Sequence, residues 1–212
     1  MRDDERLGDA IRRAYAIIGR ATPLKADCGA LCGRACCKEE SLYEYMGGPS
    51  GDAAQINAEA GAGEPTNADA GGSENADNTI DGSAPDRTGM YLFPGEYGLY
   101  PASSGRFRFY RVPFFDGWAW FLICDGSCDR RARPLACRIF PLAPHVGEAG
   151  GVTSLPDPRA RRMCPLADCE YLEPAFRRAV TSAFRYLAKE PVILKYMKLL
   201  SADLADMRRF IK

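Results

Sequence analysis

Clustered cysteines constrain the fold of this chain more than any other feature of its sequence. The nine cysteines fall into three runs, which read DCGALCGRACC, CDGSCDRRARPLACRIFPL and MCPLADC. They are Cys28, Cys32, Cys36, Cys37, Cys124, Cys128, Cys137, Cys164 and Cys169. Several thiolates gathered by short, glycine-containing loops are typical of a site that holds zinc or an iron–sulfur cluster. The runs therefore predict metal binding by loops that are distant in sequence.

The compartment decides whether such thiols are reduced. Met1 leads directly into RDDERLGDAIRR, with no apolar run behind a basic start, and the longest strongly apolar stretch, Trp118 to Cys124, is too short to cross a bilayer. We therefore expect a cytoplasmic protein with no membrane partner. Cytoplasmic thiols are kept reduced, and nine is an odd number for a protein stapled only by disulfides. Metal binding is the favoured use of the cysteines.

A long segment of small and acidic residues interrupts the chain. Residues 50–86 contain eight acidic residues and no Lys or Arg. The rest of the chain therefore has 28 basic and 28 − 8 = 20 acidic residues, so it is basic although the net charge of the whole chain is zero. Because residues 47–88 offer almost nothing to bury, we predict a disordered insertion within a single domain, 1–212. A loop insertion without function is favoured over an acidic flap that competes for the basic surface.

The remaining pattern predicts an α+β fold. Apolar residues at three-to-four spacing predict an amphipathic helix over residues 3–20. A period-two stretch over 106–111, the pair Asp116-Gly117 and the apolar run 118–123 predict a β-hairpin that ends on Cys124. Helices are expected from Pro174, from Pro191 and, with a serine cap, from Ser201.

The sequence leaves the metal and the number of sites open. Zinc would staple the fold or activate a bound group, whereas an iron–sulfur cluster would be coloured and redox-active. Iron is slightly favoured because thiols are numerous and histidine is nearly absent. Adjacent side chains diverge, so Cys36 and Cys37 bind different metals, or one of them bridges, or one is only packed.

Charged neighbours of the cysteines have two interpretations. Arginines around the second and third runs would offset the negative charge of clustered thiolates. They are Arg130, Arg131, Arg133, Arg138, Arg159, Arg161 and Arg162. A nucleic-acid surface is disfavoured because few aromatic residues are interleaved with them. The single histidine, His145, is interpreted as an ordinary loop residue rather than as a ligand.

Four segments together resemble the YkgJ-like cysteine-cluster family, described as a zinc- or iron-chelating domain with a CxxCxxCC motif. They are DCGALCGRACCK, GMYLFPGE, CDGSCDRRARPLACRIFPL and DPRARRMCPL. The resemblance implies a ligand set of Cys28, Cys32, Cys36, Cys37, Cys124, Cys128, Cys137 and Cys164. It leaves Cys169 over and gives Arg133, Pro134, Arg138 and Pro141 roles in loop shape and charge balance. The first run departs from the family in having three residues, not two, between its cysteines.

The biological role stays open at this point. The family includes flagellin lysine N-methylases, so a protein-modifying enzyme is an alternative, although the chain shows no recognisable S-adenosylmethionine loop. A thiol redox sensor using Cys36 and Cys37 is a further alternative. A metal ion is the expected partner, with a protein partner as an addition to it.

Overall fold

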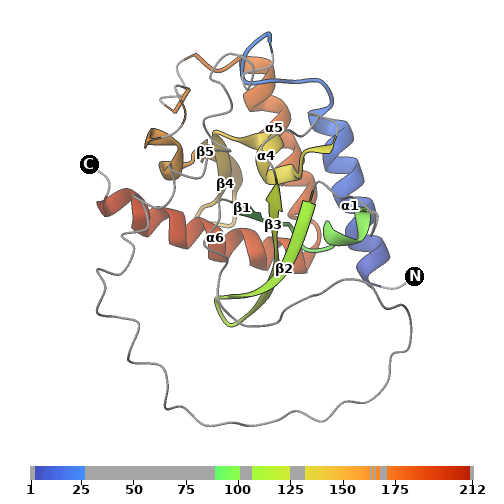
Figure 1. Ribbon diagram of the computed structural model, residues 1–212. Coiled ribbons are helices and arrows are strands. Elements are labelled where there is room, and N and C mark those ends of the chain that lie inside the picture. The colour runs from blue at the N-terminus through green and yellow to red at the C-terminus, as the bar shows by residue number, and fades with distance from the viewer. Residues whose placement is uncertain are drawn as a thin grey trace, which may run out of the picture.

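The computed structural model describes residues 3–26, 89–100, 107–124, 132–162, 164, 166–167 and 171–210. It confirms the α+β class, with helices packed around two antiparallel sheets (Figure 1). The first cysteine run, the predicted insertion at 47–88, Cys128 and Cys169 lie outside the described residues. Within the described part of the chain, no helix has both the length and the apolar character needed to cross a bilayer.

Three helices carry the larger hydrophobic core. They are α1 (Asp3–Ile18), α5 (Pro174–Leu187) and α6 (Pro191–Phe210). Each buries an apolar stripe at three-to-four spacing, such as Leu7, Ile11 and Ile18 on α1, because this period places the residues on one face. A fully buried Leu, Ile or Phe side chain contributes about 1.5–3 kcal/mol to folding. In Figure 1, α1 and α5 lie side by side, and α6 crosses below them.

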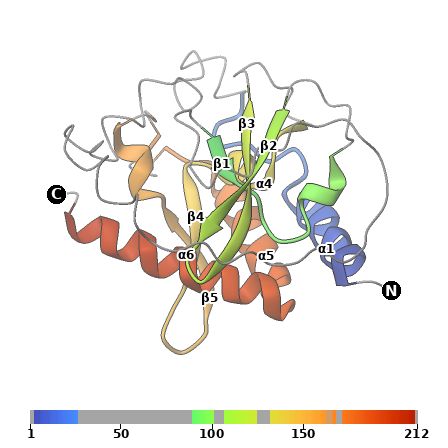
Figure 2. The same cartoon turned by 60° about the horizontal axis from the view of Figure 1, so that its bottom comes forward.

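The strands form two separate sheets. A three-stranded sheet has the order β1-β3-β2 and consists of β1 (Gly89–Tyr91), β2 (Phe107–Phe114) and β3 (Gly117–Cys124). A two-stranded sheet consists of β4 (Leu142–Val146) and β5 (Val152–Pro156), and its strands pack on α6 and α5. In Figure 2 the turn between β4 and β5 projects at the bottom of the view, beyond the turn between β2 and β3. Short helices complete the fold: η3 (Tyr97–Leu99), α4 (Leu135–Ile139) and η5 (Pro158–Arg162).

The predicted hairpin is confirmed, but its turn lies one residue earlier than expected. Phe114 pairs with Gly117, so the two loop residues are Phe115 and Asp116, and Gly117 is already in β3. Strand β2 continues through Phe114 because the Phe114 ring stacks on Tyr196 of α6, with ring centroids 5.0 Å apart. As a result Phe115 takes a left-handed φ of 52°, which is uncommon for a bulky residue.

The prediction of a separate helix from Ser201 is wrong, because α6 runs without a break from Pro191 to Phe210. The hydroxyl of Ser201 is buried and makes tertiary contacts instead of capping a helix. It accepts a hydrogen bond from the Val146 amide at 3.1 Å and lies 3.2 Å from His145 Nδ1. These contacts join α6 to β4.

Candidate metal centre

The described residues contain part of the predicted ligand set. Cys137 lies on α4, Cys164 follows η5, and Cys124 is the last residue of β3. The thiols of Cys137 and Cys164 are half-buried. Within the described residues, no group of three or more His, Cys, Asp or Glu side chains is arranged to hold a metal ion. The other predicted ligand side chains lie outside this part, so the ligand set stays a prediction.

The Cys137 thiol lies at the end of the sheet where β3 finishes. Its Sγ is 2.9 Å from Sδ of Met90 in β1. Met90 pairs with Leu122 of β3, two residues before Cys124. Figure 1 shows the arrowhead of β3 directed toward α4. Two of the predicted ligand positions, 124 and 137, therefore lie at the same end of the sheet.

The segment GMYLFPGE attaches α4 to the rest of the molecule through Glu96, whose carboxylate is fully buried. Its Oε1 accepts hydrogen bonds from the Leu135 amide at 2.6 Å and from the Tyr15 hydroxyl at 2.5 Å. Its Oε2 accepts one from the Phe93 amide at 2.9 Å. Burial raises the pKa of Glu96, and the three hydrogen bonds and the charge of Arg138 oppose part of that rise.

Arg138 and two tyrosines surround this carboxylate. The Arg138 guanidinium lies over the Tyr15 ring, 4.1 Å from its centroid, and Nε donates a hydrogen bond to the Arg133 carbonyl at 2.8 Å. Burial, followed by the charge of Glu96, raises the pKa of Tyr15. The same two causes raise the pKa of Tyr100, and Cys137 adds to that rise. These groups form a polar cluster between α1 and α4 next to the Cys137 thiol.

Two glycines permit the close approach of this segment to its neighbours. Gly95 has a φ of 84°, and a Cβ there would lie 2.4 Å from Cβ of Leu7 on α1. A Cβ at Gly89 would lie 2.5 Å from the Leu122 carbonyl oxygen of β3. Each contact requires glycine because no side chain fits.

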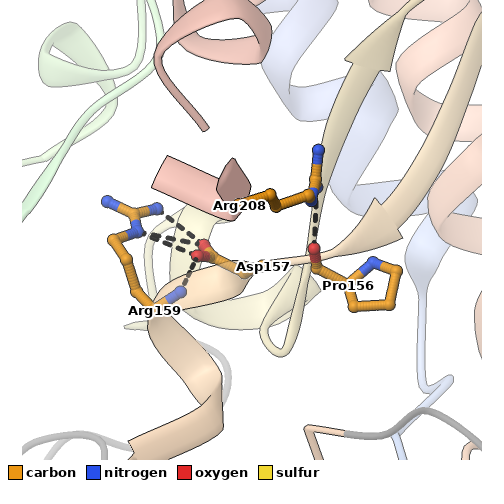
Figure 3. A network of polar contacts seen from close by, with 4 residues as sticks. All are labelled: Pro156, Asp157, Arg159 and Arg208. Atoms are coloured by element: carbon orange, nitrogen blue, oxygen red, sulfur yellow. Dashed lines mark hydrogen bonds and ion pairs between the residues drawn. The ribbon is translucent and has the colours of Figure 1, made fainter. Parts of the chain in front are cut away.

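The turn that leads to Cys164 is held by an ion pair. Asp157 is buried, and its carboxylate accepts hydrogen bonds from Arg159, with the shortest from Nη2 to Oδ2 at 2.6 Å (Figure 3). Arg208 of α6 donates to the Pro156 carbonyl at 2.8 Å, which fixes the end of β5. The Cys164 amide then donates to the Ala160 carbonyl at 2.8 Å. Arg159, predicted to offset thiolate charge, thus pairs with Asp157.

The flanks of two cysteine runs meet on α5. The Glu173 amide, just before α5, donates a hydrogen bond to the Pro23 carbonyl at 2.9 Å. Pro23 precedes Cys28 by five residues, and Glu173 follows Cys169 by four. The segment before the first run and the segment after the third run are therefore in contact at the start of α5.

His145 has a structural role in the described residues. It lies on β4 rather than in a loop, and Nδ1 of its ring faces Ser201 of α6. The prediction of a loop position is therefore wrong, because His145 pairs with Thr153 of β5 in the two-stranded sheet.

The sequence interpretation missed Glu96, Tyr15 and Met90 as neighbours of the site. One signal was available, since Glu96 is the only charged residue in the apolar segment GMYLFPGEYGLY. An isolated carboxylate in such a segment is expected either at the surface or in a buried hydrogen-bonded position. Sequence alone does not choose between the two positions.

Comparisons with known proteins add no relative. No family model matches the chain, no curated protein is significantly similar to it, and no solved structure matches it significantly.

Proposed function

We propose that this protein binds zinc or iron through its clustered cysteine thiolates, with an iron–sulfur cluster as one form of the iron. The ligands are the eight cysteines Cys28, Cys32, Cys36, Cys37, Cys124, Cys128, Cys137 and Cys164. The observation that carries the proposal is the position of the Cys137 thiol, half-buried at the end of the sheet where β3 finishes at Cys124. The hydrogen bond between Glu173 and Pro23 supports it by joining the flanks of the first and third cysteine runs.

The donor chemistry fits these metals. Thiolates are the preferred ligands of structural zinc and of iron–sulfur clusters, and the Met90 thioether beside Cys137 adds a second soft sulfur next to this thiol. A bound metal would supply either a fold staple, as zinc does, or a redox centre, as a cluster does. The chain itself positions the thiols and partly shields Cys137 from water.

Anaerobic purification, followed by elemental analysis and a visible spectrum, tests the proposal. Iron together with acid-labile sulfide and a broad absorbance band at about 400 nm would identify an iron–sulfur cluster. Colourless protein with stoichiometric zinc would identify a zinc site. Metal-free protein that keeps its thermal unfolding transition after treatment with a chelator would overturn the proposal, because binding of structural metal is coupled to folding.

A further inference from the structure

Helix α4, which carries Cys137, begins without a local cap. The residue before it is Pro134, which has no side-chain group that accepts a hydrogen bond, and none is made there. The first amides of a helix have no partner within the helix, so a buried start needs an acceptor from elsewhere. Leu135, the first residue of α4, is fully buried, and water does not supply that acceptor.

Glu96 supplies this acceptor from a distant part of the chain. The residue lies 39 positions before Leu135, and its Oε1 lies 2.6 Å from the Leu135 amide nitrogen. The same oxygen accepts the Tyr15 hydroxyl of α1, and Oε2 is held by the Phe93 amide. The carboxylate is thereby fixed by α1 and by its own turn, so it gives α4 one defined position.

Arg138, in the last turn of α4, contacts the same cluster. The Arg138 amide donates to the Pro134 carbonyl at 3.0 Å, and the Arg138 guanidinium covers the Tyr15 ring. Cys137 lies between Leu135 and Arg138, both of which contact the Glu96–Tyr15 pair. A change in the length of the side chain at position 96 is therefore transmitted to the thiol within one turn of helix.

We propose that Glu96 is a positioning residue for Cys137, setting the place of this thiol at the proposed metal site by hydrogen-bonding the start of α4. The metal part of this inference rests on the proposed function, whereas the placement of the thiol does not. Loss of an outer-shell partner typically lowers metal affinity ten- to a hundredfold. Glu96 is further from the metal than such a partner, because it acts through Leu135, and it likewise sets the position of the ligand.

Three variants of the full chain separate positioning from general stability. Glu96→Asp keeps the charge but is one methylene shorter, so it withdraws from Leu135. Glu96→Gln keeps an oxygen for Leu135 and Tyr15, and places an NH₂ group against the Phe93 amide. Val180→Ala on α5 is the control, because it removes buried apolar volume from the core.

Two readouts are measured on each variant. The first is the rate of maleimide labelling of Cys137 relative to Cys164 in reduced, metal-free protein, resolved by peptide mass spectrometry. The second is the affinity for Zn²⁺ in competition with a chelator. We expect Glu96→Asp to raise the labelling ratio about tenfold and to lower Zn²⁺ affinity about ten- to a hundredfold. Glu96→Gln should fall between Glu96→Asp and the wild type. Val180→Ala should leave the labelling ratio unchanged, and any fall in its Zn²⁺ affinity should be no larger than its loss of unfolding free energy requires.

The outcomes distinguish this inference from the proposed function. If the wild-type chain binds no metal, the proposed function fails, and the labelling ratio alone decides the role of Glu96. If the metal-free chain is unfolded, the Zn²⁺ affinities decide it. Equal ratios and equal affinities in Glu96→Asp and wild type would overturn the inference while leaving metal binding intact. An equal change in Val180→Ala would also overturn it, because the effect would then be one of stability.

Discussion

The helical side of the molecule and the end that carries Cys137 are stabilised in different ways. The helical side buries a continuous set of apolar side chains from α1, α5 and α6, including Phe176, Phe184 and Met197. The smaller apolar cluster, on the other face of the β1-β3-β2 sheet, has three buried members in the part of the chain that the structure describes, which are Leu92, Phe107 and Leu122. Beside this cluster, the first amide of α4 donates its hydrogen bond to one buried carboxylate, that of Glu96.

This difference separates the stability of the fold from the geometry of the site. Apolar packing is nondirectional, so its stabilisation is spread over many contacts, and no single contact fixes the position of one side chain. A buried hydrogen bond is directional, and its loss leaves an unsatisfied group that costs about 1–3 kcal/mol. Mutations on the helical side should therefore change stability alone, whereas mutations near Glu96 should change the position of Cys137.

The largest effect is expected from Phe176→Ala in the core. This side chain is fully buried, and its truncation leaves a cavity that costs about 3–5 kcal/mol. Denaturant unfolding measures the loss, and metal content per folded chain should be unchanged. A folded variant with reduced metal content would show that the two regions are not separable.

Gly95→Ala tests the attachment of the GMYLFPGE segment to α1. The new Cβ would lie 2.4 Å from Cβ of Leu7, and the residue at position 95 has a φ of 84°. We expect the free energy of unfolding to fall by about 2–4 kcal/mol, mostly because of the contact with Leu7. Gly150→Ala is a matched control, because its φ is 78° and a Cβ there meets nothing within 4 Å. Equal losses of unfolding free energy in the two variants would show that the contact with α1 contributes nothing.

Glu96 gives stability a specific dependence on pH. Its pKa is raised by burial above the ordinary value of 4.5, so the folded state binds this proton more tightly than the unfolded chain. The group therefore favours folding fully below pH 4.5, and this contribution is lost as pH rises through the folded pKa. Glu96→Gln has no such proton, so the stability of wild type relative to this variant should fall as pH rises from 4.5. Parallel pH profiles of unfolding free energy would contradict the assignment.

The smallest effect is expected at the ion pair between the hairpin turn and α6. Asp116 Oδ2 lies 3.0 Å from Lys195 Nζ, and a hydrogen bond and the charge of Lys195 lower the pKa of Asp116. The contribution is present above the ordinary pKa of 3.8 and is lost as pH falls through the lower folded value. Because both groups are exposed, we expect Asp116→Asn to change the melting temperature slightly and only at low salt. An effect that persists in high salt would contradict this.

Local patterns predicted α1, the hairpin of β2 and β3, α5 and the start of α6, whereas distant contacts explain two of the errors. The spacing of Leu7, Ile11 and Ile18 was sufficient for α1, because an apolar stripe is a property of the segment itself. The position of the hairpin turn was not predictable, because it depends on the stacking of Phe114 on Tyr196. Ser201 was misinterpreted for the same reason, since its hydroxyl has partners on β4.

At the candidate site, too, local patterns and distant contacts differ in what could be predicted. Cysteine clustering predicted a metal site, which stays a prediction, and of the expected ligands the structure places positions 124 and 137 at one end of the sheet. The contact between Glu96 and Leu135 joins segments 39 residues apart, so no local pattern contains it.

The metal content of Cys137→Ser compared with Cys169→Ser tests the central claim most directly. Cys137 is a proposed ligand at the end of β3, and Cys169 is the cysteine left outside the ligand set. Elemental analysis of both variants, purified without oxygen beside the wild type, should give metal in Cys169→Ser at the wild-type ratio per chain and a clear loss in Cys137→Ser. Equal metal content in the two variants, or none in the wild type, would contradict the account.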